Sequence, residues 1–248
     1  MTRSLHRTVF RTAACSFLVP VFALAVAAVF AQQPAPTAKT DAEIIYGIDD
    51  SVSRRTNAIS TYSVQEQYTL YRNGDTTPAA EETIQTVYTR AIGKEYTPIA
   101  QSGSAFLRSA VIDKVLAGEK DLNLAANREG ALITSKNYDL QPQPGAVELN
   151  GRICILVTLK PLRKSAHLFT GKMWIDASDY TVVRLEGAPS QSPSIFAGQT
   201  TVARDYIKID GFSMATHAEA RSHTFLFGDT LLKIDYTNYK IQQDPPAK

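Results

Sequence analysis

The stretch that decides the fold is GRICILVTLKPLRKSAHLFTGKMWIDASDYTVVRLEG, residues 151–187. Its first segment, residues 153–159, is almost wholly apolar and rich in β-branched side chains, which is typical of a strand buried on both faces. Pro161 has no N–H to donate to a neighbouring strand and should end that segment. A basic loop then leads to a second predicted strand at residues 172–176, and a short turn leads to a third at residues 180–186. Three antiparallel strands with one strongly apolar face need the rest of the chain to cover them.

The numbering of residues within these strands separates an apolar face from a mixed one. Side chains alternate faces along a strand, so odd-numbered residues share one side, and here that side is apolar. We predict that it points to the concave side of the sheet and lines a ligand site formed by Ile155, Val157, Leu159, Met173, Ile175, Val183 and Leu185. The even-numbered Trp174, Tyr180 and Val182 should then form a cluster on the convex side. The simpler interpretation of the apolar side is a core that lies beneath helices.

The start of the chain is predicted to be an export signal, residues 1–31. Three arginines precede an apolar run of about 15 residues at 16–30, and small residues precede a cleavage position after Ala31. An uncleaved membrane anchor is the alternative. The run is shorter than the roughly 20 residues that a spanning helix needs, and it contains Pro20. We therefore expect a cleaved signal and a periplasmic protein.

The composition of the predicted mature chain argues against a nucleic-acid-binding protein and against a protein stabilised by internal disulfides. The chain has 26 Lys plus Arg and 24 Asp plus Glu, and the signal removes three Arg and no acid, which leaves a net charge of −1. A nearly neutral chain gives no electrostatic basis for binding nucleic acid. Cys154 is the one cysteine left, so no internal disulfide is predicted, and we interpret it as a small buried hydrophobe.

Two helices are predicted before the central stretch. After a Pro/Ala linker at residues 32–40, a capping box begins at Thr40 and apolar residues follow at helical spacing, which predicts an amphipathic helix over residues 41–55. Ser104 should cap a second helix, and Gly118 should end it.

The remaining chain shows the alternation and turn residues of further antiparallel strands. Pro142 and Pro144 should break the strand that precedes them. Residues 41–242 are predicted to form one domain, followed by a disordered tail at 243–248. The further predicted strands are residues 62–70, 82–92, 95–101, 132–135, 138–140, 199–209, 212–220, 221–227 and 230–241.

Several residues of the central stretch resemble the signature region of outer-membrane lipoprotein-sorting proteins, the LolA/LolB-like group. That group shares its fold with the lipid-sensing domain of RseB-type periplasmic regulators. The resemblance covers roughly residues 135–241 and departs from the group's pattern at Ala215, where a proline would be expected after Gly211-Phe212. The residues that carry it are Leu159-Lys160-Pro161, Gly171, Trp174-Ile175-Asp176, Tyr180 and Val183-Arg184.

The resemblance implies a fold and a function. The expected fold is α+β and β-dominated: a curved antiparallel half-barrel sheet with two helices on its concave face, which holds acyl chains. The expected protein is a monomeric periplasmic carrier of acyl chains or lipoproteins, with no cofactor and no catalytic activity, and with a membrane-bound donor or acceptor as a further partner. The alternative is a lipid-sensing regulator that docks on a membrane partner through Ile195 and Phe196.

Three other patterns point weakly to chemistry. His217 and His223 share a strand face, but six residues along a strand place them roughly 20 Å apart, too far to bind one metal ion. The residues around Ser213 resemble a hydrolase nucleophile elbow, a motif that needs a helix after the serine, whereas strand alternation follows here. Asp176 and Asp179 flank a turn and offer too few carboxylates for calcium.

Overall fold

The structure is a computed structural model that describes residues 39–191, 200–224 and 228–244. The chain divides into two units, Met1–Ala38 and Lys39–Lys248, and all described elements belong to the second. The predicted export signal and its cleavage position, and the proposed docking residues Ile195 and Phe196, lie outside the described residues. None of the helices in the described part has the length and apolar character needed to cross a membrane.

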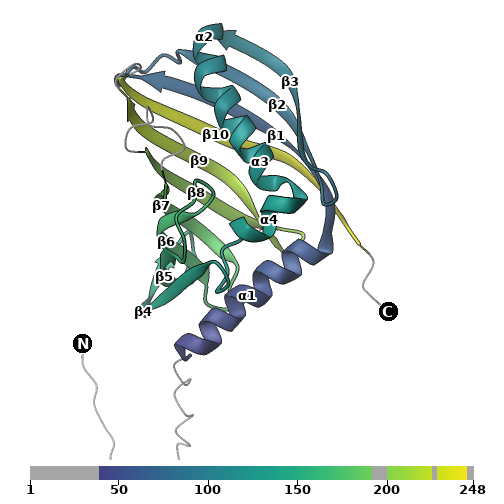
Figure 1. Ribbon diagram of the computed structural model, residues 1–248, viewed down its shortest axis with the longest axis vertical. Coiled ribbons are helices and arrows are strands. Elements are labelled where there is room, and N and C mark those ends of the chain that lie inside the picture. The colour runs from purple at the N-terminus through teal and green to yellow at the C-terminus, as the bar shows by residue number, and fades with distance from the viewer. Residues whose placement is uncertain (1–38, 192–199, 225–227, 245–248) are drawn as a thin grey trace, which may run out of the picture. The chain divides into compact units, whose positions relative to one another are not determined.

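The described strands form a ten-stranded antiparallel sheet in the order β3-β2-β1-β10-β9-β8-β7-β6-β5-β4 (Figure 1). β3 and β4, which follow one another in the sequence, are the two edge strands and do not pair. Every pairing joins strands that are neighbours in sequence, except that of β1 with β10, which joins the first and last parts of the domain into one layer. The strands are β1 (Ile59–Arg72), β2 (Ala80–Thr89), β3 (Gly93–Gly103), β4 (Tyr138–Leu149), β5 (Arg152–Pro161), β6 (Phe169–Asp176), β7 (Val182–Pro189), β8 (Thr200–Ile209), β9 (Phe212–Thr224) and β10 (Gly228–Gln243).

The helices lie on one face of this sheet (Figure 1). The helix α1 crosses the end that contains β4 to β7, and the other segments cover β1, β2, β3 and β10. This arrangement confirms the predicted fold class, an open, curved, β-dominated antiparallel sheet with helices on one side. The helical segments are α1 (Asp41–Ala58), α2 (Ala105–Leu107), the π-helical η1 (Arg108–Ile112), α3 (Asp113–Asn123) and α4 (Ala125–Ala131).

Helix α1 begins where the sequence predicts. The Thr40 hydroxyl accepts a hydrogen bond from the Glu43 amide at 3.3 Å, and the Glu43 carboxylate accepts one from the Thr40 amide at 2.7 Å. This reciprocal capping box satisfies two amides that have no partner within the helix. The helix continues beyond the predicted residue 55 to Ala58.

The second predicted helix begins correctly and ends in the wrong place. The Ser104 hydroxyl caps it by accepting from the Leu107 amide at 3.3 Å. Gly118, however, keeps a helical backbone rather than the left-handed conformation that ends helices, and α3 continues to Asn123. A glycine stops a helix only when the following residues favour the turn, and here Glu119 holds the next turn against the sheet.

Residues 132–135 form a turn rather than the predicted strand. The Asn137 side chain donates to the carbonyl oxygens of Glu129 at 2.8 Å and Leu132 at 2.9 Å. These bonds hold Asn137 close to the end of α4. Residues 132–135 therefore cannot extend along the sheet as a strand.

Three strand predictions also need correction. β4 extends past Pro142 and Pro144, although its pairing with β5 is interrupted between Pro142 and Ala146; it is the last strand of the sheet, and its outer edge needs no N–H donors. Gly171 lies inside β6 rather than before it, and a Cβ there would lie 2.0 Å from the Glu186 carbonyl oxygen on β7. The predicted strands 212–220 and 221–227 are not separate where the structure describes them: residues 212–224 form one continuous strand, β9, and residues 225–227 lie outside the described residues.

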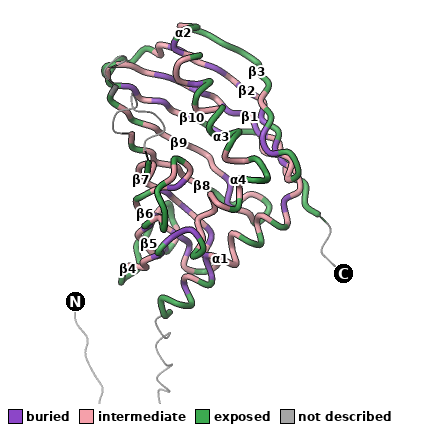
Figure 2. The backbone as a smooth tube through the Cα atoms, viewed as in Figure 1, coloured by how far each residue is buried: buried purple, intermediate pink, exposed green. Residues whose placement is uncertain are grey.

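Most of the buried apolar residues fall into two clusters, one under α1 and one under the other helical segments. Figure 2 shows where along the backbone the buried residues lie. The α1 core consists of Ile44, Ile48, Tyr138, Leu140, Val157, Leu159, Leu168, Met173, Ile175 and Leu185. The α3 core consists of Ile59, Tyr62, Val64, Tyr68, Leu70, Ala80, Ile84, Tyr88, Leu107, Ile112, Met214, Ala218, Leu232, Ile234 and Tyr236.

Candidate functional site

The structure brings together six of the seven predicted ligand-binding residues. Val157, Leu159, Met173, Ile175 and Leu185 are buried in the α1 core, and Ile155 packs at its edge; Val183 is buried but belongs to neither core. Two side chains of α1, Ile44 and Ile48, cover this face. The residues therefore form packed core beneath α1, and their contact with a ligand stays a prediction.

The expected convex cluster is wrong for Tyr180 and Val182. Val182 pairs with Ile175, and a register shift leaves Val183 as an extra residue in β7. The residues before Val183 therefore point to the opposite face of the sheet from the one that simple alternation predicts. Tyr180 has a φ of 61°, and its ring lies 2.4 Å from where a Cβ on Gly47 would be. Both side chains therefore pack against the α1 core on the helix side of the sheet.

Beneath α3 the same face of the sheet carries buried charges. Glu119 of α3 forms ion pairs with Lys94 of β3 and with Arg204 of β8, the latter at 2.7 Å. Burial alone would raise the pKa of the Glu119 carboxyl, but the two cations outweigh it and hold that pKa well below its ordinary range. Burial alone would lower the pKa of Lys94, and Glu119 keeps it well above its usual value. All three groups are therefore charged at neutral pH.

The two ion pairs of Glu119 also show that the sheet is curved. Lys94 and Arg204 stand on strands five places apart, which on a flat sheet would be separated by about 24 Å. Side chains that stand upright on a flat sheet do not bridge that distance. Because both cations contact one carboxylate, the sheet must curve around α3.

Several buried polar atoms near this ion-pair network have no hydrogen-bond partner among the described residues. They belong to side chains on the helix side of β1, β2, β3, β8 and β10. Buried polar atoms in proteins normally form hydrogen bonds, so this half of the concave face differs from an ordinary apolar core. The atoms are Glu66 Oε1, Glu82 Oε2, Thr86 Oγ1, Tyr96 OH, Arg204 Nε and Tyr236 OH.

A cavity of about 170 Å³ lies between the end of α1, the first two strands and the segments α3 and α4. The rings of Tyr62 and Tyr88 form one wall and stack with their centroids 4.9 Å apart. The cavity is amphipathic, because guanidinium, hydroxyl and amide groups face the same space as aliphatic side chains. Its other lining residues are Arg55, Thr56, Ile59, Leu122, Asn123, Arg128, Ala131 and Leu132.

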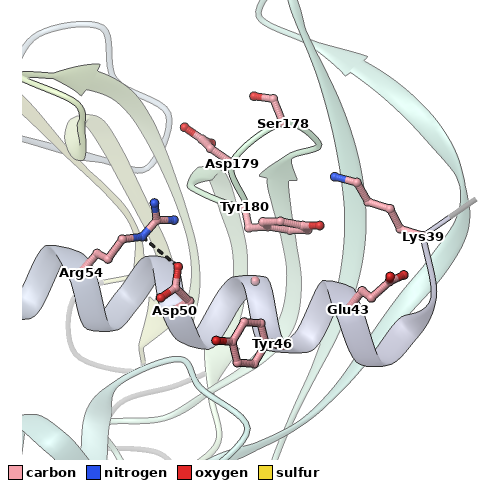
Figure 3. A pocket seen from close by; sticks show the side chains of 9 residues that line it. Lys39, Glu43, Tyr46, Asp50, Arg54, Ser178, Asp179 and Tyr180 are labelled. Atoms are coloured by element: carbon pink, nitrogen blue, oxygen red, sulfur yellow. Dashed lines mark ion pairs between the residues drawn. The ribbon is translucent and has the colours of Figure 1, made fainter. Parts of the chain in front are cut away.

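A larger hollow of about 440 Å³ lies beside the N-terminal half of α1, next to the turn between β6 and β7 (Figure 3). Its charged side chains already have partners within the domain, so they offer little to a ligand. Arg54 pairs with Asp50 at 2.9 Å, and Lys39 lies 4.3 Å from the centroid of the Tyr180 ring. Asp179 pairs with Lys208 at 2.6 Å. We therefore take the smaller cavity as the candidate site.

The Asp176 turn has a structural role. The carboxylate accepts hydrogen bonds from the Ser178 amide at 2.8 Å, from Arg152 at 2.8 Å and from Lys208 at 3.2 Å. Burial alone would raise the pKa of Asp176, but these donors outweigh it and hold the pKa well below its usual range. The carboxylate is thus used in closing the turn between β6 and β7.

The patterns that suggested catalysis or metal binding lack the necessary surroundings. The buried Ser213 hydroxyl donates to the Val182 carbonyl at 2.5 Å, and the serine lies within a strand rather than before a helix. His217 contacts Asp235 at 2.6 Å and His223 contacts Asp229 at 2.7 Å, so each histidine has its own carboxylate. In the described ranges, no three His, Cys, Asp or Glu side chains gather as metal ligands.

Two features of the site could not be read from the sequence. Arg55 and Arg128 reach the same cavity only because α4 folds back towards the end of α1, and α4 lies beyond Gly118, where the second helix is predicted to end. Glu119 meets Arg204 through the curvature of the sheet. The buried, even-numbered Glu66 and Glu82 did carry a signal, since a charge on the apolar face of an alternating strand is unusual.

Comparisons with known proteins give similarities of structure only. No family model and no curated protein matches the chain. A DUF1329 family protein from Desulfovibrio piger matches with a TM-score of 0.41 and 12% identity, over 82% of this chain and 95% of that one.

Two further solved structures come from other bacteria. A LolA superfamily protein from Nitrosomonas europaea matches with a TM-score of 0.41 and 14% identity, over 84% of this chain and 96% of that one. A domain described as an outer membrane lipoprotein-sorting protein from Vibrio parahaemolyticus matches with a TM-score of 0.44 and 10% identity, over 79% of this chain and 91% of that one. The solved structures that this chain is similar to thus include LolA superfamily and lipoprotein-sorting proteins.

Proposed function

We propose that this protein is an exported, periplasmic carrier that binds acyl chains, free or attached to a lipoprotein, and catalyses no reaction. The observation that carries the proposal is the amphipathic cavity between the concave face of the sheet and the helices α3 and α4. An acyl chain that displaces these helices from the sheet would bury its methylene groups against the α3 core, at about 0.8 kcal/mol for each CH₂.

The packing of the helices supports an opening on this side. Neither α3 nor α4 has a fully buried residue, whereas α1 buries Ile44, Gly47 and Ile48. Val115 and Leu116 of α3 are only partly buried against the α3 core. Lifting α3 and α4 alone, with the buried Leu107 and Ile112 of α2 and η1 left in place, therefore removes no buried apolar side chain from the core, and the main polar attachment of α3 is the Glu119 carboxylate.

The seven ligand-binding residues predicted from the sequence remain a prediction. They would form a second wall of the acyl-binding site. Because Val157 and its neighbours are covered by α1, a chain that contacts them must first displace Ile44 and Ile48. The regulator hypothesis relies on Ile195 and Phe196, outside the described residues, and no described feature favours it over a carrier.

The direct experiment is to purify the exported protein, extract it with organic solvent and identify bound lipids by mass spectrometry. Titration of the delipidated protein with a fluorescent long-chain fatty acid then measures affinity. We expect saturable binding at one or a few sites. A protein that carries no lipid and takes up no acyl probe would contradict the proposal.

A further inference from the structure

Two arginines that line the candidate cavity have no carboxylate partner among the residues that the structure describes. Arg55 lies in the last turn of α1, and its Nε donates to the Ser213 carbonyl oxygen at 3.2 Å. Arg128 lies in α4 and donates to the carbonyl oxygens of Arg90 at 2.7 Å and Asn123 at 3.0 Å. Within the described ranges, neither guanidinium forms an ion pair.

This lack of a counter-charge contrasts with the other cations of the concave face. Lys94, which is buried, and Arg204, which is half-buried, share the Glu119 carboxylate, as expected for cations that are largely removed from water. The Nε of Arg128 is buried and has no hydrogen-bond partner among the described residues, and its guanidinium carbon lies 5.2 Å from the centroid of the Tyr88 ring. The cavity is therefore lined by two cations that have no carboxylate partner in the described ranges, and an anion bound there would supply the counter-charge.

The size and the walls of the cavity indicate how much of a ligand it could hold. Its volume of about 170 Å³ is below the roughly 300 Å³ of a pocket that encloses a whole drug-sized molecule. The polar groups of Thr56 and Asn123 stand beside the two arginines, while Leu122 and Leu132 continue the wall with apolar surface. Such a space suits the charged end of an amphiphile and the start of its chain.

We propose that this cavity binds the anionic head group, a carboxylate or a phosphate, of an acylated ligand, with Arg55 and Arg128 as its cationic partners. The inference rests on the proposed acyl-binding function and adds selectivity for charge at the head of the ligand. A free anion without a chain lacks the apolar contacts and should bind poorly.

The test compares ligands that differ only at the head. The exported protein is titrated with a fluorescent long-chain fatty acid, with its methyl ester, and with the phosphate monoester of the same chain. Inorganic phosphate is added as a competitor. We expect both anionic probes to bind about tenfold more tightly than the ester, since hydrogen bonds to charged groups are the stronger class. Millimolar inorganic phosphate should not displace them.

Variants then assign the preference to the two arginines. Arg55→Gln and Arg128→Gln should each reduce the anion-to-ester affinity ratio, and the double variant should bring it close to one. Arg128→Lys, which keeps the charge, should retain part of the preference. Arg54→Gln is the matched control, because Arg54 is the neighbouring residue on α1 and pairs with Asp50 away from the cavity.

The affinity ratio separates this inference from a structural role and from the proposed function. Arginines that merely hold backbone carbonyl groups would alter stability, measured by urea unfolding, without altering the ratio. Equal binding of acid and ester by the unaltered protein, or a preference that persists in the double variant, would overturn the inference while leaving acyl binding intact. Displacement by inorganic phosphate alone would overturn it in favour of a free-anion site. Failure of every acyl probe to bind would instead contradict the proposed function.

Discussion

The two ends of the concave face are built from one sheet, yet they are covered in different ways. Under α1 the side chains form a buried apolar core, in which Ile44 and Ile48 of the helix pack with strand residues such as Val157. Under α3 the face carries buried Glu66 and Glu82, and the helix contributes partly buried aliphatic residues and one carboxylate. The first arrangement is typical of permanent structure. In the second, α3 itself buries no apolar side chain, and several buried polar atoms have no partner among the described residues, which favours a region that moves and binds.

The largest expected effect is at the centre of the α1 core. Val157→Glu would place a carboxylate at a fully buried position within an apolar cluster, and should destabilise the protein by about 3–5 kcal/mol. Urea unfolding followed by circular dichroism measures this loss. Val147→Glu on the exposed side of β4 is the control and should change the midpoint little, because Val147 is 44% exposed. Equal midpoints for the two variants would show that the α1 core is not closed.

Removal of the charge that attaches α3 should have a smaller effect. Glu119→Gln leaves Lys94 and Arg204 without their shared carboxylate, and we expect a loss of about 2–3 kcal/mol because Arg204 keeps some contact with water. Glu129→Gln, which breaks an exposed pair with Lys136, should change nothing measurable. Amide hydrogen exchange should locate the loss of stability in α3. An unchanged exchange rate of the α3 amides in Glu119→Gln would contradict the claim that Glu119 attaches this helix to the sheet.

The same carboxylate predicts a dependence on pH. The folded pKa of Glu119 lies below its unfolded value, so its stabilising contribution is complete above about pH 4.5 and is lost as the pH falls further. The difference in unfolding midpoint between the unaltered protein and Glu119→Gln should be constant from pH 6 to 8 and should shrink below about pH 4.5. A difference that stays constant down to pH 3 would mean that Glu119 acts through packing and not through charge.

The smallest expected effects come from one substitution made on each helix. Gly47→Ala brings a methyl group within 2.4 Å of the Tyr180 ring and should cost about 1 kcal/mol, since the ring must move. Gly118→Ala on α3 meets no atom within 4 Å and should stabilise by about 0.5–1 kcal/mol through helix propensity. Changes of opposite sign in the free energy of unfolding, measured in urea, would confirm that α1 packs tightly and that α3 is loosely covered. Changes of the same sign for both variants would contradict this difference between the two helices.

The sequence predicted the parts of the fold that local chemistry determines. The capping box at Thr40, the Ser104 cap and the end of β5 at Pro161 follow from backbone groups and side chains a few residues apart. Predictions failed where a distant strand or the edge of the sheet decided the outcome. Pro142 is tolerated because β4 has no outer neighbour, and the bulge at Val183 arises from its pairing with β6.

The candidate site was less predictable than the fold for the same reason. The apolar face at Val157 is visible as a simple alternation, but alternation does not tell whether a helix or a ligand covers it. Arg55 and Arg128 are 73 positions apart in the numbering and give no motif. Their shared cavity depends on how α1 and α4 lie on a curved sheet.

The central claim is that the side of the sheet under α3 and α4 opens to a ligand while the side under α1 stays closed. Hydrogen–deuterium exchange with mass spectrometry, with and without a saturating fluorescent fatty acid, tests it most directly. We predict that amides of α3 and α4 exchange faster than those of α1 in the free protein and that ligand alters the exchange of α3, α4, β1 and β2. Altered exchange confined to α1 and strands β5 to β7 would contradict the claim and place the ligand against Val157.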